Sequence, residues 1–329
     1  MSTNACFIVS KKSFVSFSDF VLAAFLLDLL FGDPKWLPHP VCGIGKLLQW
    51  LEKPARRLGN ETLGGVLAVL VLSALVGGVC EVLVSFLGGW SIFIAVYLSW
   101  SGLALGSLLR ECRKALELVE SGDLEAGRRA VGMLVSRNTA DMDQAQLCRS
   151  LGESLSENFN DGFVAPFFWL VFFGPVGLWI YKAVSTVDSM WGYKTPRWRK
   201  LGCFGARLDD VLAYVPARLS ALFLLLVELV KAEDKPGIVS FAEVRRQAAR
   251  MESPNAGWPM AMSAWLVWAS MGGPTPYNGK IVDKPLLGPA GVPWTPSHVR
   301  RLLQLVATAG VVGFLILWGA GYAGHRLFG

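Results

Sequence analysis

Two long apolar runs in the first third of the chain constrain the fold more than any other feature. They cover Leu63 to Leu87 and Trp90 to Leu109, and each is long enough for an α-helix that crosses a bilayer, which takes about 20 residues. Apolar residues make up 53% of the chain and charged residues only 17%, whereas a soluble domain is about one-quarter charged. We therefore predict an all-α fold: a multi-pass integral membrane protein with amphipathic helices and polar cytoplasmic loops.

Further apolar runs bring the expected number of membrane spans to roughly four to six. The first of them contains Asp28, which should face protein or water because a carboxylate facing lipid costs a few kcal/mol. Lys and Arg gather in the polar segments, as in cytoplasmic loops. We expect one integral membrane domain over residues 1–329, with a polar helical insert at about 110–162. The further runs are Phe14 to Phe31, Phe163 to Val184, Leu212 to Val230 and Leu302 to Tyr322.

The polar segments between these runs show both helical and loop patterns. Ile44 to Arg57 is predicted to be a short amphipathic helix on the membrane surface. Ser121-Gly122-Asp123 breaks a helical pattern inside the insert, and Thr139 is a plausible N-cap for the helix that follows it. Gly272 to Pro296 is predicted to be a loop.

The run Phe163 to Val184 is interrupted by Gly174-Pro175 and again by Gly177. Proline inside a helix kinks or stops it. Basic, motif-like loops lie on both sides of the run, so a simple crossing would place one of them on the wrong side of the membrane. We therefore expect a broken or re-entrant segment, which is allowed only where its backbone is buried in protein or lines a wet cavity.

Several classes of site are disfavoured by what the sequence lacks. The six cysteines are scattered without a C-x-x-C pair, which argues against a disulfide framework or a zinc site. His39, His298 and His325 lie far apart in the sequence, which argues against a histidine metal cage. There is no Walker A, G-x-S-x-G or H-E-x-x-H motif. No basic helix or binding motif predicts a nucleic-acid partner.

The stretch Glu153 to Trp169 joins dense polar chemistry directly to an apolar run. In a helix its three acids, Glu153, Glu157 and Asp161, would share one face. Like charges on one face destabilise a helix, so a cation, a basic partner or solvent must offset them. A solvated helix face that leads into the membrane is the alternative interpretation. The interleaved hydrogen-bonding side chains favour a site: Ser154, Ser156, Asn158 and Asn160.

Other polar motifs combine acids with basic or hydrogen-bonding side chains. The three prolines of Gly32 to Val41 fix a stiff turn that presents Asp33 and His39. Arg137 could clamp a phosphate or a carboxylate. In the next motif, helical spacing brings together Lys182, Thr186 and either Asp188 or Ser189.

Adjacent Asp209 and Asp210 stand with Arg207 at a predicted helix entrance. They could bind a divalent metal or serve only as helix N-terminal charge. Arg218, near the start of an apolar run, should face protein or the interface, and Asn255 lies in a rigid turn. Acid clusters with Arg and Lys suit a site that handles phosphate through a divalent ion.

Three long motifs carry a resemblance to a known family. They are E-S-L-S-E-N-F-N-D-G-F-V-A-P-F-F-W from Glu153, K-A-V-S-T-V-D-S-M-W-G-Y-K from Lys182 and A-R-L-D-D-V-L-A-Y-V-P-A-R-L from Ala206. The sequence resembles the CobD/CbiB family of cobalamin biosynthesis, the adenosylcobinamide-phosphate synthases. The resemblance runs from G-D-P-K-W-L-P-H-P-V to G-G-P-T-P-Y-N-G, nearly the whole chain. One departure is Asn138, where many relatives are expected to have Asp in an Arg-Asp-Thr pattern.

The resemblance implies a multi-pass inner-membrane enzyme with its active site on the cytoplasmic side. It would join the amine of aminopropanol, or of its O-phosphate, to a propionate carboxylate of adenosylcobyric acid. The family reaction is written with ATP as co-substrate and a divalent metal, here Mg²⁺. Membrane lipid and other late cobalamin-pathway enzymes would be partners. Phosphoryl transfer to the carboxylate would make an acyl phosphate, from which the amine displaces phosphate once a base has deprotonated the ammonium.

We hypothesise roles for the polar residues on this basis. The predicted Mg²⁺ ligands are carboxylates, namely Glu153, Glu157, Asp161, Asp209 and Asp210. The first three are also predicted to be catalytic, with Asp33 or His39 as the base. Arg137, Lys182 and Arg207 would bind phosphate or carboxylate. The remaining predicted substrate-binding residues are Asn138, Thr139, Ser154, Asn158, Asn160, Thr186, Asp188, Ser189, Arg218 and Asn255.

Two other classes of function stay open at this point. One is a membrane transporter for a corrinoid or another anion, which the apolar helices and the broken run favour. Against it, the polar chemistry lies in loops and no internal repeat is evident. The other is a non-catalytic membrane regulatory protein, which the intact acid motifs argue against.

Overall fold

The computed structural model describes residues 17–34, 36, 38–86, 88–231, 240–277 and 280–328. The structure is 77% helical with almost no sheet, which confirms the predicted fold class. One correction concerns Gly272 to Pro296, which we predicted to be a loop. A β-hairpin occupies its first half, where β1 (Met271–Tyr277) pairs with antiparallel β2 (Lys280–Leu287).

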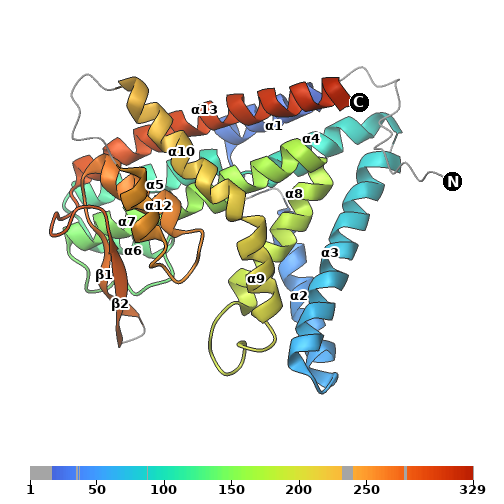
Figure 1. Ribbon diagram of the computed structural model, residues 1–329, viewed down its shortest axis with the longest axis horizontal. Helices are drawn as coiled ribbons and strands as arrows, with labels where there is room; N and C mark the ends of the chain where they lie inside the picture. Colours follow the sequence, from blue (N-terminus) through green and yellow to red (C-terminus); the bar gives the residue numbers. More distant parts are fainter. Residues whose placement is uncertain are drawn as a thin grey trace.

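The helices cross one another at steep angles instead of forming a simple parallel bundle (Figure 1). Short turns of 3₁₀-helix (Gly88–Trp90) and π-helix (Asn160–Val164, η2) link some of them. The helices are α1 (Phe17–Phe31), α2 (Pro40–Arg57), α3 (Glu61–Phe86), α4 (Ser91–Ser101), α5 (Leu105–Glu120), α6 (Leu124–Gly132), α7 (Gln144–Phe159), α8 (Ala165–Trp191), α9 (Cys203–Leu212), α10 (Tyr214–Lys231), α11 (Phe241–Ala248), α12 (Gly257–Val267) and α13 (Pro296–Phe328).

Four helical segments of the described chain are long and apolar enough to cross a membrane, or five if the pair α9–α10, bent by 43°, counts as one span. This agrees with the predicted range. The four are Glu61–Phe86, Gly88–Glu120, Gln144–Trp191 and Pro296–Gly324. The predicted first membrane helix, Phe14 to Phe31, is not among them. Its described part, α1, has 15 residues, fewer than the about 20 that a span takes, and residues 14–16 lie outside the described residues.

Helix α8 folds back on itself at Gly174. This residue has φ 66° and ψ −167°, a conformation that is open to glycine but strained for other residues. Beyond the bend, Lys182 Nζ lies 3.5 Å from the main-chain oxygen of Asp161. In a straight helix these two residues would be about 30 Å apart. The predicted break at Gly174-Pro175 is therefore confirmed, and it brings Lys182 close to Asp161.

Asp28 is fully buried and holds the start of α5. Its Oδ2 accepts hydrogen bonds from the main-chain N–H groups of Leu105 and Gly106, at 3.0 and 3.2 Å. A helix N-terminus has N–H groups without intrahelical partners, and a carboxylate stabilises them. The prediction that Asp28 faces protein is confirmed. The predicted single run Trp90 to Leu109 is instead divided into α4 and α5 at this point.

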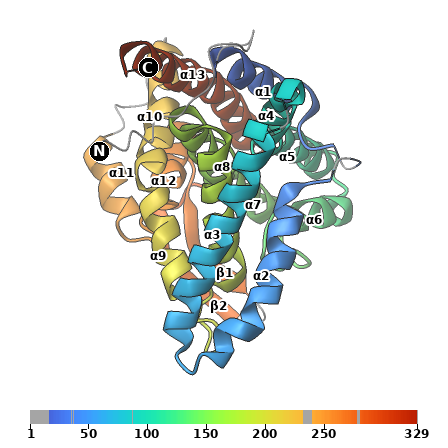
Figure 2. The ribbon, with the colours of Figure 1, turned by 90° about the vertical axis from the view of Figure 1, so that its right-hand side faces the viewer.

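Helices α2, α3 and α9 descend together toward one tip of the molecule (Figure 2). The predicted amphipathic helix at Ile44 to Arg57 is confirmed as part of α2, which buries Ile44 and Leu48. Gly64 and Gly65 of α3 pack directly against main-chain carbonyls, so that a side chain at either position would overlap them. This close packing fixes α2 and the end of the α8–α9 connection against α3.

The region predicted to be a polar insert, at about 110–162, contains α6, α7 and most of α5, and acids cap the starts of these helices. Asp123 caps α6 by accepting from Ala126 N at 2.9 Å, as the predicted break there requires. Asp143 caps α7 and forms a capping box with Gln146. Thr139 was predicted to be this N-cap, which is wrong, because its hydroxyl donates to the Arg128 carbonyl at 2.8 Å.

Candidate active site

The acidic face of α7 begins with a buried ion pair. Arg137 and Glu153 are in contact, and their side chains are 6% and 1% exposed. The other Glu153 oxygen accepts from Gly272 N at 2.9 Å, while Arg149 donates to the Gly272 carbonyl at 2.8 Å. Both carboxylate oxygens of Glu153 are thus engaged. The pair fastens the start of β1 to α7, and each Glu153 oxygen accepts a hydrogen bond within the protein.

The second acid on this face of α7, Glu157, is near a lysine of the hairpin, Lys284. Glu157 is solvent-exposed one turn beyond Glu153, and it lies in electrostatic range of Lys284 on β2. Lys284 pairs across the hairpin with Gly273, so the Gly272 contact with Glu153 also places Lys284. Sequence reasoning missed Lys284 as a site residue. Its only signal was a basic residue in a proline-rich segment.

Asp161 is oriented by a chain of hydrogen bonds through the π-helical turn η2. Asn160 Nδ2 donates to Asp161 Oδ1 at 2.7 Å, and Ser220 of α10 donates to Asn160 Oδ1 at 2.9 Å. π-helical turns inside α-helices occur frequently at functional sites. Asn160 was predicted to bind substrate, and here it is buried and positions Asp161.

Lys182 lies where four separate parts of the sequence meet. Its ammonium is in electrostatic range of Asp161, Asp209 of α9, and both Asp28 and Asp33 from the start of the chain. Three of the polar motifs predicted from the sequence therefore come together in space. The fold at Gly174 is the reason, because it turns the second half of α8 back toward η2.

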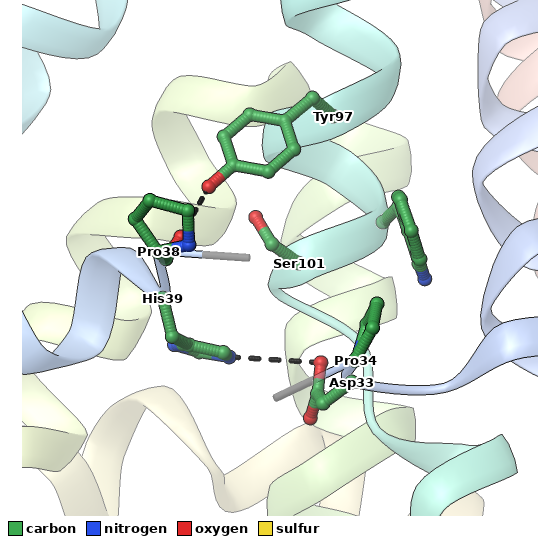
Figure 3. Close-up of a pocket in the computed structure, with 7 residues that line it drawn as sticks. Asp33, Pro34, Pro38, His39, Tyr97 and Ser101 are labelled. Atoms are coloured by element: carbon green, nitrogen blue, oxygen red, sulfur yellow. Dashed lines mark hydrogen bonds and ion pairs between the residues drawn. The ribbon is translucent and has the colours of Figure 1, made fainter. Parts of the chain in front are cut away.

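Asp33 and His39 face each other across a small pocket between the α1–α2 connection and α4 (Figure 3). His39 Nε2 lies 3.7 Å from Asp33 Oδ1, and its Nδ1 accepts from Val41 N at 3.2 Å. In this arrangement a neutral His39 carries its proton on Nε2, toward Asp33. His39 thus has no free lone pair for a base, whereas Asp33 retains one oxygen for that role. The same Asp33 is anchored by Ser107, which accepts from Asp33 N at 2.7 Å.

Two more acids, Asp188 and Asp210, extend the acidic group around Asp161 and Asp209. Asp188 on α8 is in electrostatic range of Asp161, Asp209 and Asp210. Asp188 and Asp210 are half-buried. Thr186 and Ser189 belong to the same helix, but their hydroxyls donate to the carbonyls one turn before them, at 2.7 and 2.9 Å.

Other predicted substrate-binding residues make contacts within the protein or lie apart. Arg218 donates to Asn255 Oδ1 at 2.7 Å, and Asn255 donates to the Asp210 carbonyl at 2.8 Å, so this pair braces α9 and α10 against the turn before α12. Asn158 donates to Ser154, which itself donates to the Leu134 carbonyl. Asn138 and Arg207 are exposed.

Comparison with known proteins agrees with the resemblance seen in the motifs. Residues 21–306 match the family described as CobD/Cbib protein. The chain belongs to this family. Relatives named cobalamin biosynthesis protein CobD include those of Pelobacter propionicus, 38% identical over 80% of this chain and 83% of the relative, and Listeria monocytogenes, 34% identical over 90% and 96%. The relative from Geobacter metallireducens is 38% identical over 87% and 91%. No solved structure matches.

Membership in the CobD/CbiB family makes this a cobalamin biosynthesis protein, and the metal expected by resemblance can be tested against its side chains. Within the described ranges, no group of three or more His, Cys, Asp or Glu side chains could hold a metal ion by itself. The predicted set of five carboxylates is therefore not gathered, and Glu153 is engaged elsewhere. Mg²⁺, however, commonly binds through one or two carboxylates plus water and substrate phosphate. The neighbouring acids Asp188 and Asp210 fit that manner of binding.

Proposed function

We propose that this protein is an ATP-dependent ligase that forms an amide between a propionate carboxylate of adenosylcobyric acid and the amine of aminopropanol or its O-phosphate. The observation that carries the proposal is the meeting of Lys182 with Asp33, Asp161 and Asp209. An amide-forming ligase must hold an anionic acyl donor and a cationic amine side by side. A cation set among acids in a half-buried site supplies binding groups of both signs.

The residues of this chain would divide the work between the two substrates. Lys182 would hold the propionate carboxylate or the phosphate, and Lys284 would hold a second anionic group above Glu157. Asp33, oriented by His39, would accept the proton that the ammonium releases before it attacks. Asp188 and Asp210 would hold Mg²⁺ together with a substrate phosphate, and the ion when bound would neutralise phosphate charge. We place this site at the cytoplasmic side of the inner membrane.

Reconstitution tests the reaction directly. Purified protein is incubated with adenosylcobyric acid, aminopropanol phosphate, ATP and Mg²⁺, and the amide product is measured by mass spectrometry. Product that depends on all four components supports the proposal. Accumulation of unmodified adenosylcobyric acid inside proteoliposomes, with no amide, would instead identify a transporter.

Glu157→Gln examines the acidic face of α7 in the same assay. The substitution keeps the side-chain shape but removes the charge opposite Lys284, so amide formation should fall about a hundredfold or more. Glu117→Gln, on the exposed face of α5, is the matched control and should have normal turnover. Normal turnover of Glu157→Gln as well would remove Glu157 from the site.

A further inference from the structure

Three buried polar atoms near Lys182 make no hydrogen bond. They are Asp28 Oδ1, Asp209 Oδ1 and the hydroxyl of Tyr181. Tyr181 is 1% exposed, and its hydroxyl is in electrostatic range of Asp161 and Asp209. Ser185 lies close to that hydroxyl but makes no hydrogen bond of normal geometry with it. Buried polar groups without partners are rare and costly, so atoms of this kind in one cluster point to a ligand.

The charge of the cluster indicates the sign of that ligand. Asp28, Asp33, Asp161 and Asp209 are in electrostatic range of Lys182. Arg110 is in range of Asp28, and Asp188 is in range of Asp161. Ionised carboxylates only accept hydrogen bonds, and buried carboxylates need a cation beside them. These five acids outnumber the two cations, Lys182 and Arg110. A cation that donates hydrogen bonds would suit these carboxylates.

We propose that Asp161, Asp209 and Tyr181 form the subsite for the primary ammonium group of the amine substrate. A primary ammonium has three N–H donors, and two carboxylates with one phenol oxygen offer three acceptors. Tyr181 would accept one N–H and donate its own hydrogen to a neighbouring carboxylate. The identity of the amine rests on the proposed function, whereas the need for an ammonium-like cation rests on the cluster itself.

Tyr181 is well placed to hold such a ligand. Its ring packs against Ala165 and Ala213 in a small separate core, so the ring is held between η2 and the α9–α10 bend. Asp161 is fixed by a hydrogen bond from Asn160. The acceptors are thus supplied by segments that their own packing holds in place, as a preorganised binding site requires. Sequence reasoning passed over Tyr181 because it stands inside an apolar run.

The test measures amine binding without turnover. The full-length protein in detergent micelles is titrated calorimetrically with 1-amino-2-propanol, with 1,2-propanediol as the neutral analogue, and with Mg²⁺ alone. Asp209→Asn and Tyr181→Phe preserve shape and packing, and Asp141→Asn, at an exposed position, is the matched control. We expect the amine but not the diol to bind the wild type and the control. Asp209→Asn should weaken amine binding about ten- to a hundredfold, and Tyr181→Phe about three- to tenfold.

Each other result overturns the subsite. Equal binding of the diol would show that the ammonium is not recognised. Unchanged amine affinity in both variants would place the amine elsewhere. Binding of Mg²⁺ but not the amine, lost in Asp209→Asn, would make the cluster a metal site. The proposed reaction is tested separately. If the amine binds and both variants weaken that binding, but the reconstituted assay gives no amide, the reaction is refuted and the subsite is retained. Amide formation with an unchanged KM for the amine in both variants rejects the subsite alone.

Discussion

A substitution at Glu153 can distinguish two roles of this residue. Glu153 was predicted to be a Mg²⁺ ligand, whereas in the structure it fastens the β-hairpin to α7 through its ion pair with Arg137. If it fastens the hairpin, Glu153→Ala removes the carboxylate from a buried guanidinium and the acceptor from Gly272 N. Breaking a buried ion pair from one side costs about 3–5 kcal/mol, a large part of the about 5–15 kcal/mol that stabilises a folded protein. At about 2–4 °C per kcal/mol for a chain of at least 150 residues, the Tm should fall by roughly 6–20 °C.

The measurement is thermal unfolding of the purified protein in one detergent, beside turnover and the KM for the corrinoid. Arg137→Met with Glu153→Leu removes both charges and should recover most of the lost Tm, because an apolar pair of similar volume is often as stable as a buried ion pair. Glu111→Ala is the control, since its pair with Lys114 is exposed and worth about 0–1 kcal/mol. A normal Tm in Glu153→Ala combined with lost Mg²⁺-dependent turnover would refute the fastening role and restore the metal role.

Further predictions concern the bend, the central lysine and a peripheral ion pair. Gly174→Ala should cost about 1–3 kcal/mol because φ is positive there, and should lower both Tm and turnover. Gly78→Ala is the control, because no atom lies near the added methyl group, and it should leave both unchanged. Equal effects of the two substitutions would show that the conformation of Gly174 is not required for the bend. Lys182→Met should abolish amide formation and lower the Tm, because it leaves the neighbouring carboxylates without their cation. Normal turnover would remove Lys182 from the site. Burial disfavours the charged form of Glu52, but hydrogen bonds from Arg197 and Arg56 outweigh it and lower its pKa. The stability that Glu52 adds is then present above its unfolded pKa and is lost as the pH falls through the folded pKa, so the Tm difference from Glu52→Gln should shrink on acidification; a pH-independent difference would contradict this.

The sequence predicted the long apolar helices, the break at Gly174 and the orientation of Asp28 toward protein or water, because each follows from local chemistry. The membrane allows few structures for each of these features, which are a long apolar run, a proline that follows a glycine, and a carboxylate in an apolar helix. The β-hairpin was missed for a physical reason. Pro274, Pro276 and Pro285 lack N–H donors, and proline inside a strand pattern argues against a strand. A two-stranded ribbon has only edge strands, which tolerate proline.

The role of Glu153 could not be predicted, because helical spacing identifies the face a side chain occupies but not what covers that face. Glu153, Glu157 and Asp161 share a face as predicted, yet each meets a different neighbour. Arg137 and Gly272 cover the first, Lys284 approaches the second, and Lys182 lies beside the third. Those neighbours come from distant segments. Two of the companions predicted for Asp161, namely Lys182 and Asp209, were identified because they belong to sequence motifs. Lys284 and Tyr181 lie outside those motifs and were missed.

The bend in α8 explains how so acidic a site can be built from apolar segments. A carboxylate facing lipid is costly, so the acids must gather where protein or water surrounds them. A straight helix from Asp161 to Asp188 would extend about 40 Å and leave those two residues at opposite ends of an apolar span. Because Gly174 reverses the chain, its apolar middle, including Phe172 and Phe173, is exposed on the outside of the bend, while Asp161, Lys182 and Asp188 come together at its open end. The apolar surface and the polar site are thus produced by one conformational choice, which is why Gly174→Ala should impair stability and turnover together.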